Sequence, residues 1–81
     1  MPRWINDEKG RYYQAELVQD LFGAWTLITW WGGLGSRRGA MRSTAVASLE
    51  AGLERLRRID KTRLGNGYRR ADDRPTSSAP S

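Results

Sequence analysis

The first half of the chain alternates short apolar or aromatic runs with turn residues, a pattern typical of antiparallel strands joined by tight connections. In residues 11–19 alternate side chains fall on opposite sides of a strand, and the side that carries Tyr13 is the less polar. Residues 24–31, AWTLITWW, form the strongest predicted strand because β-branched and aromatic residues dominate them. Shorter strands are predicted over residues 2–6 and 40–46.

The connections between these strands contain residues that favour turns. DLFG at residues 20–23 is predicted to close a hairpin, because Asp20 can hydrogen-bond the turn backbone and Gly23 can adopt a positive φ. GGLGSRRG at residues 32–39 is predicted to be a longer and more pliable connection. Its glycines do not have the dinucleotide-loop spacing, and a strand pattern follows them where a helix would be required.

Two adjacent tryptophans end the strongest predicted strand. If the strand stays regular, Trp31 shares its side with Leu27, whereas Trp30 shares the opposite side with Ile28. The two indoles therefore cannot both enter one core. The pattern leaves open which of these two faces is covered.

From Ser48 the period changes to that of an amphipathic helix. Apolar residues recur at steps of four, three and three, and charged residues occupy the other positions. Ser48 is suited to be the N-cap, and Gly65 is a natural stop. The apolar stripe consists of Leu49, Leu53, Leu56 and Ile59.

The composition limits the chemistry that the chain can perform. The 81 residues are sufficient for one domain, and without Cys or His the chain lacks thiolate and imidazole ligands and the commonest general base. The scattered carboxylates suggest neither acid–base catalysis nor a metal cage. We therefore expect no enzymatic activity, no metal and no cofactor. Because no signal peptide or membrane span is evident, we expect a soluble cytoplasmic monomer.

Charge is distributed unevenly along the chain. Residues 1–36 carry three basic and four acidic side chains, whereas residues 37–81 carry eleven and five, and the whole chain has a net charge of +5. Twelve of the basic residues are arginines, which bind phosphate with a forked geometry and lie flat on bases. A positive field of this kind favours polyanions, chiefly nucleic acid, although a solvated surface can also be basic.

The end of the chain divides into two parts. GNGYRR at residues 65–70 is predicted either to pack back on the domain or to add a short binding edge. Residues 71–81 lack large apolar side chains and are predicted to be disordered. The domain is thus expected to occupy residues 1–70, followed by the tail at 71–81.

The ordered series DLFGAW, WGGLGSRRG and GY, followed over residues 2–70, resembles a WGR domain. This module is named for a Trp-Gly-Arg motif and occurs in poly(ADP-ribose) polymerases and in small or fused bacterial proteins. The resemblance implies an α+β fold in which an antiparallel sheet of about four strands has one helix packed across it. Trp31 and Gly32 match the first two motif positions, but Gly33 stands in place of the arginine.

The resemblance also implies nucleic-acid binding, in which the motif Trp packs against a nucleotide at a DNA end and the motif Arg reaches the backbone. Since Gly33 carries no charge, we expect Arg37 or Arg38 to supply it, with Arg42, Arg69 and Arg70 assisting. Stacking and phosphate contacts imply recognition of DNA ends or structure with little sequence preference. The alternative is a module that docks a protein partner through the same aromatic surface, which the missing motif arginine favours.

Overall fold

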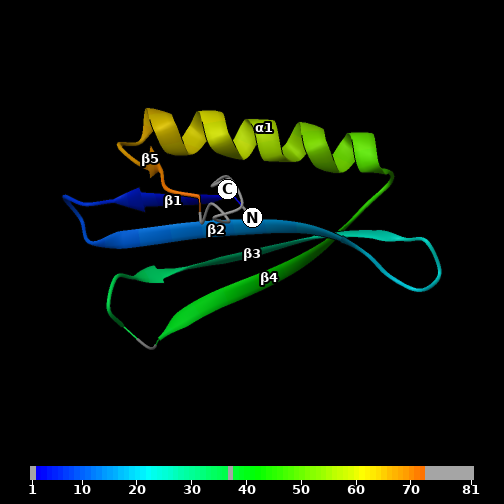
Figure 1. Ribbon diagram of the computed structural model, residues 1–81, viewed down its shortest axis with the longest axis horizontal. Helices are drawn as coiled ribbons and strands as arrows, with labels where there is room; N and C mark the ends of the chain where they lie inside the picture. The colour runs from blue at the N-terminus through cyan, green and yellow to red at the C-terminus, as the bar shows by residue number, and fades with distance from the viewer. Residues whose placement is uncertain (1, 37, 73–81) are drawn as a thin grey trace, which may run out of the picture.

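The computed structural model describes residues 2–36 and 38–72. In this part of the chain a single antiparallel sheet carries one helix on one of its faces (Figure 1), which confirms the predicted α+β class. The strands lie in the order β4-β3-β2-β1-β5. The element bounds are β1 (Arg3–Asn6), β2 (Arg11–Gln19), β3 (Trp25–Gly33), β4 (Gly39–Val46), α1 (Leu49–Gly65) and β5 (Arg69–Arg70). The four predicted strands are present, and β5 adds a short fifth strand beside β1.

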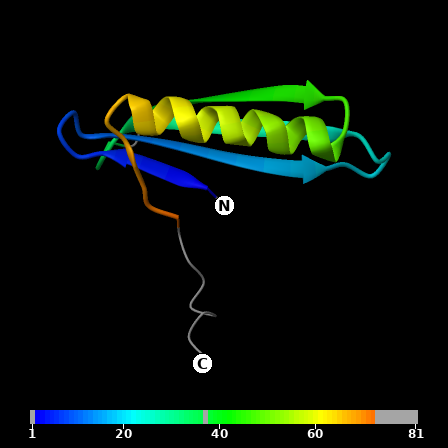
Figure 2. The same ribbon diagram turned by 90° about the horizontal axis from the view of Figure 1, so that it is seen from above.

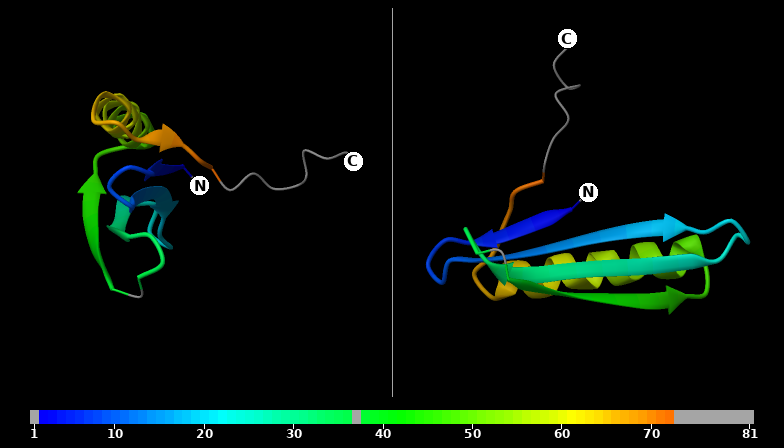
Figure 3. Two further views of the ribbon diagram at one scale, coloured as in Figure 1. Left: turned by 90° about the vertical axis from the view of Figure 1, so that its left-hand side faces the viewer. Right: turned by 90° about the horizontal axis from the view of Figure 1, so that it is seen from below.

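The register of β2 against β3 settles which indole faces the helix. Tyr13 lies opposite Trp31 and Leu17 lies opposite Leu27, and residues directly opposite in an antiparallel pair project to the same face. Leu17 contacts the helix at Gly52, so this face is the one that α1 covers. Trp30 projects from the other face, where no element of the described chain covers the sheet (Figure 3).

The helix begins where the sequence predicts. Ser48 is the N-cap, and its Oγ accepts a hydrogen bond from the Ala51 backbone N–H at 3.1 Å. The helix runs along the sheet in nearly the same direction as the strands (Figure 2). It ends at Gly65, with Asn66 as the C-cap, and Gly67 takes the positive φ of 89° that turns the chain toward β5.

The predicted apolar stripe of the helix is only half right. Leu56 and Ile59 pack on the core, but Leu49 and Leu53 remain 40% and 42% exposed. The helix instead approaches the sheet most closely at Gly52, where an added Cβ would lie 2.5 Å from Leu17 Cδ1. β1 pairs only with the first four residues of β2, so it does not extend beside the later part of that strand, where Leu17 meets the helix.

The core is small and lies between β1, β2, β3 and the helix. Its fully buried apolar members are Trp4, Ala15 and Leu27. Six partly buried side chains surround them: Tyr13, Leu17, Val46, Leu56, Ile59 and Tyr68. Trp4 is the largest of the buried residues, so a single aromatic side chain supplies much of the buried apolar area.

The two ends of the sheet differ in character. One end holds the DLFG hairpin, in which the Asp20 carboxylate accepts hydrogen bonds from the backbone N–H groups of Phe22 and Ala24, and Gly23 has a φ of 86°, as predicted. The other end gathers the β1–β2 turn, the β3–β4 connection and the C-terminal end of α1 (Figure 1). Segments distant in sequence thus meet around Trp31.

The described chain continues slightly beyond the predicted domain boundary. The Ala71 N–H donates to the Arg3 carbonyl at 2.7 Å, and the Asp72 carboxylate accepts from the Arg3 N–H at 3.0 Å. Most of the predicted tail, residues 73–81, lies outside the described residues. No described helix is long and apolar enough to span a membrane.

Candidate nucleic-acid interface

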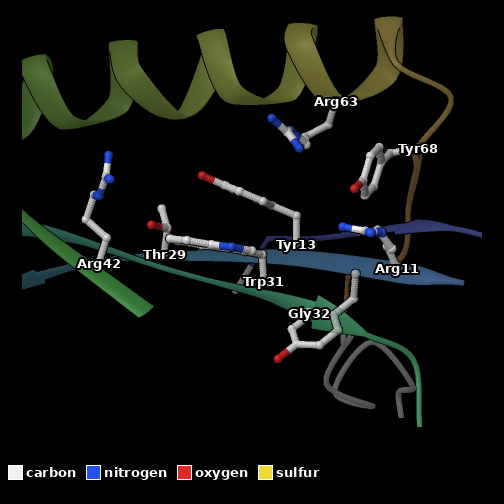
Figure 4. Close-up of a pocket in the computed structure, with 9 residues that line it drawn as sticks. Arg11, Tyr13, Thr29, Trp31, Gly32, Arg42, Arg63 and Tyr68 are labelled. Atoms are coloured by element: carbon white, nitrogen blue, oxygen red, sulfur yellow. The ribbon is translucent and has the colours of Figure 1, made fainter. Parts of the chain in front are cut away.

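A pocket of about 330 Å³ opens between the sheet and the C-terminal half of α1, at the end that holds the β3–β4 connection. We call it the aromatic pocket. Strands β2, β3 and β4 form its floor and one side, while α1 and the residue before β5 close the other side (Figure 4). Its lining consists of Arg11, Tyr12, Tyr13, Thr29, Trp31, Gly32, Arg42, Arg63 and Tyr68.

The aromatic rings of the pocket are continuous with the core. Tyr13 and Trp31 stack with their centroids 6.1 Å apart and their planes at 14°, and Tyr13 meets the buried Trp4 edge-on at 6.0 Å. Trp31 is half-buried. Its indole is therefore held by Tyr13 and the sheet, rather than enclosed among leucines, and part of it faces the pocket (Figure 4).

The side chain of Arg63 extends from α1 into this pocket. Its Cζ lies 4.4 Å from the centre of the Tyr13 ring and 5.2 Å from that of Tyr68, so the guanidinium makes cation–π contacts with both tyrosines. Its Nε is buried and has no hydrogen-bond partner among the described residues. A buried donor without an acceptor costs about 1–3 kcal/mol.

Two further arginines face the same space from the strands. Arg11 enters from the start of β2 and Arg42 rises from β4 (Figure 4). No carboxylate of the described chain lies within ion-pair distance of Arg11, Arg42 or Arg63, and the lining contains no acidic residue. The pocket therefore holds three uncompensated positive charges around exposed aromatic surface, an arrangement that attracts phosphate and stacks bases.

The glycines that follow Trp31 have different structural roles. A Cβ on Gly32 would lie 2.9 Å from the Arg38 carbonyl oxygen and 3.2 Å from Gly39 Cα, so only glycine allows β3 and the return to β4 to approach this closely. At Gly33 an added Cβ would meet nothing closer than 3.7 Å. The backbone therefore leaves room for a Cβ at the position where the motif has arginine.

Arg38, Arg69 and Arg70, the other described arginines predicted for the site, do not line the pocket. Arg38 is exposed in the β3–β4 connection, and Arg37 lies outside the described residues. Arg69 bonds Asp7 at 2.6 Å, which raises the pKa of the arginine and lowers that of the carboxyl. Arg70 bonds Asp72 at 2.6 Å and Asp60 at 3.2 Å. All four arginines remain predicted nucleic-acid contacts, although Arg69 and Arg70 of β5 already form ion pairs with carboxylates.

The Arg70 ion pairs have a clear electrostatic effect. Hydrogen bonds from the Arg70 guanidinium lower the pKa of Asp72 to about 2, and the carboxylates raise the pKa of Arg70. Its Cζ also lies 5.4 Å from the Trp4 ring centre. Arg70 thus fastens β5 and the residues after it to the helix and the core, on the side of the helix away from the aromatic pocket.

Sequence reasoning placed Trp31, Gly32 and Arg42 in the site but did not identify Arg11, Tyr13 or Arg63. The alternation of β2 puts Arg11 and Tyr13 on the Trp31 side once the register is known. Arg63 has no signal in the strand pattern. Its position four residues beyond Ile59 on the helix was the available clue, since side chains at that spacing share a face.

Comparison with known proteins identifies the family of this chain. Neither the curated proteins nor the solved structures contain a match to this chain. The comparison with protein families matches residues 3–75 to the WGR domain, which covers both the sheet and the helix that enclose the aromatic pocket. WGR domains are known as nucleic-acid-binding modules. The chain belongs to the WGR domain family.

Proposed function

We propose that the chain binds nucleic acid without catalysis, at the aromatic pocket, and recognises DNA ends or unpaired structure with little sequence preference. One observation carries the proposal: partly exposed Trp31 and three arginines without described carboxylate partners line the same pocket. A base or sugar packs on the indole edge and face that Tyr13 leaves uncovered. The guanidinium groups bind the adjoining phosphates, and none of these contacts reads a base edge in a groove.

The rival interpretation, a protein-docking module on the same surface, drew its support from the missing motif arginine. Three arginines from other parts of the chain stand around Trp31, so the absence of charge at Gly33 no longer favours that rival. The salt dependence of binding distinguishes the two interpretations. Phosphate binding weakens steeply as salt rises because bound counterions are released, whereas docking of an uncharged apolar surface does not.

The first prediction concerns the two adjacent tryptophans. Trp31→Ala is expected to weaken binding about 5-fold to 100-fold, because stacking on one aromatic ring contributes about 1–3 kcal/mol. The measurement is fluorescence anisotropy with labelled blunt, nicked and single-stranded oligonucleotides at low and moderate salt. Thermal denaturation of each variant checks that the fold persists.

Trp30→Ala is the matched control, since it removes the neighbouring indole from the opposite face of the same strand. Its affinity for every oligonucleotide should equal that of the wild type. If wild-type affinity is absent or insensitive to salt, or if both variants lose affinity equally, the proposal is wrong.

We further propose that Arg11 takes the place of the missing motif arginine. Arg11 is the cross-strand partner of Gly33, and both positions project toward the helix side of the sheet, so a guanidinium from either one can reach the pocket. Arg37 and Arg38 remain candidates from the neighbouring connection. Arg11 differs from Arg38 in that it lines the pocket.

An exchange of charge between these paired positions tests the assignment. Arg11→Gln is expected to weaken binding to duplex ends and to reduce the slope of log affinity against log salt by about 1, the effect of one lost phosphate contact. Adding Gly33→Arg should restore both quantities, because position 33 projects to the same side as Arg11 and a Cβ there meets no atom closer than 3.7 Å. A double variant that binds as weakly as Arg11→Gln, or an Arg11→Gln variant that binds like the wild type, contradicts the assignment.

A further inference from the structure

A second cavity adjoins the aromatic pocket and extends it along the helix. It has a volume of about 290 Å³ and lies between α1 and strands β3 and β4. Tyr13, Thr29 and Arg42 line both cavities, so the two form one continuous depression. We call the second cavity the helix–β4 groove. Its remaining lining residues are Leu27, Thr44, Arg55, Arg58 and Ile59.

The charge of the helix–β4 groove is uniform. Its lining includes three arginines and no acidic residue. Arg55 has no described carboxylate within ion-pair distance, and Arg58 reaches Glu54 only at 3.7 Å, with most of its side chain exposed. Glu54 itself lines the next depression toward the start of the helix, so the uniformly basic stretch ends there. A polyanion entering from the aromatic pocket would meet no acidic lining residue until that point.

The spacing of the arginines suits a chain of phosphates. Arg55 and Arg63 are eight residues apart on α1, which corresponds to about 12 Å along the helix axis. Successive nucleotides of one stacked strand rise about 3.4 Å, so this distance spans about three or four nucleotides. The groove is flanked by α1 on one side and by β4 on the other, and its volume of about 290 Å³ is at the lower end of the range for small-ligand pockets, which favours one strand over a duplex.

We infer that the helix–β4 groove is a track for a single strand of nucleic acid, whose phosphates contact Arg42, Arg55 and Arg58 as the strand leaves the aromatic pocket. This inference rests on the proposed function, since the strand enters through that pocket. It assigns the domain a site several nucleotides long. It also gives the exposed charges on this side of the helix a role beyond solvation.

The test compares two double variants that remove the same charge from the same helix. Arg55→Gln with Arg58→Gln alters the groove. Arg57→Gln with Lys61→Gln alters exposed positions that do not line it. Each pair lowers the net charge by two and removes one arginine that contacts Glu54. Melting temperatures verify that both variants fold.

Binding is measured with labelled thymidine oligonucleotides of two and eight nucleotides over a range of salt. With the octamer, the groove variant should bind at least fivefold more weakly than the control variant, and its salt slope should be lower by about 1.4, the value for two phosphates on a single strand. With the dinucleotide, which occupies the aromatic pocket alone, the two variants should bind alike. A uridine octamer tests whether RNA uses the same track.

The outcomes separate this inference from the proposed function. Equal octamer affinities and equal slopes for the two double variants overturn the single-strand track, even if Trp31→Ala weakens binding as expected. Wild-type protein that binds no oligonucleotide overturns both. A lower slope and weaker octamer binding confined to the groove variant support the track.

Discussion

Replacing Arg63 with methionine is expected to weaken nucleic-acid binding by tenfold or more while leaving the melting temperature unchanged or higher. The side chain lies in the aromatic pocket without a described carboxylate partner, and its buried Nε lacks a hydrogen bond. The cost of that unsatisfied donor, about 1–3 kcal/mol, is offset by two cation–π contacts of about 0.5–2 kcal/mol each. Methionine keeps the apolar contact with the tyrosine rings and removes the charge, so stability changes little.

The expected loss of affinity does not depend on the stability of the fold. In the proposed complex Arg63 would donate charge-assisted hydrogen bonds to a phosphate, which methionine cannot do, and a hydrogen bond to a charged group contributes about 1.5–3 kcal/mol. Isothermal titration and thermal denaturation of the same preparations measure the two effects together. Arg63→Lys is the companion variant: it keeps the charge but not the planar stack on Tyr13 and should recover part of the affinity.

An Arg63→Met protein that unfolds several degrees earlier than the wild type and still binds normally would mean that Arg63 is a structural residue. The prediction also distinguishes Arg63 from Arg70, which contacts an aromatic ring but has two carboxylate partners. Arg70→Met should destabilise the fold instead, since it leaves Asp60 and Asp72 without their guanidinium.

Trp4→Ala is expected to unfold most of the protein at 25 °C. Trp4 is 1% exposed, packs edge-on against Tyr13, and donates a hydrogen bond from Nε1 to the Asp60 carboxylate at 2.8 Å. Truncating a buried tryptophan costs about 3–5 kcal/mol, and a core of this size supplies about 3–5 kcal/mol in total. The loss therefore equals the stability available.

Far-UV circular dichroism and urea denaturation measure this loss. Trp4→Phe keeps most of the apolar area but not the bond to Asp60, and should fall between the wild type and Trp4→Ala. Trp30→Ala, on the open face, should retain a cooperative transition. A Trp4→Ala variant whose transition lies within a few degrees of the wild type would show that the core does not depend on this ring.

The tryptophans show that strand alternation predicts the orientation of a side chain but not its burial. Strand alternation correctly separates Trp30 from Trp31, because the side-chain period of a strand is a local property. It does not distinguish the buried Trp4 from the half-buried Trp31, since both lie on the helix side of regular strands. The difference in burial between the two indoles depends on how far the helix and the neighbouring strands extend over each position.

The helix gives a second example. Ser48 could be identified as the N-cap because capping depends on one hydroxyl and the next three residues. The apolar stripe was assigned to four regularly spaced side chains, yet the contact with the sheet is centred near Gly52, where the absence of a side chain permits close approach to Leu17. A glycine has no hydrophobic signal, so periodicity alone assigns Leu49 and Leu53 to the core.

Local patterns in the sequence predict four of the five strands, the hairpin, the start of the helix and the opposite orientation of the two adjacent indoles, and an ordered series of short motifs indicates the WGR family. These features depend on residues that lie close together in the chain. Which indole the helix covers, and which arginines surround it, depends on the packing of the helix against the sheet. Arg11, Arg42 and Arg63 come from two strands and the helix, and the sheet register and the helix packing bring them to one pocket.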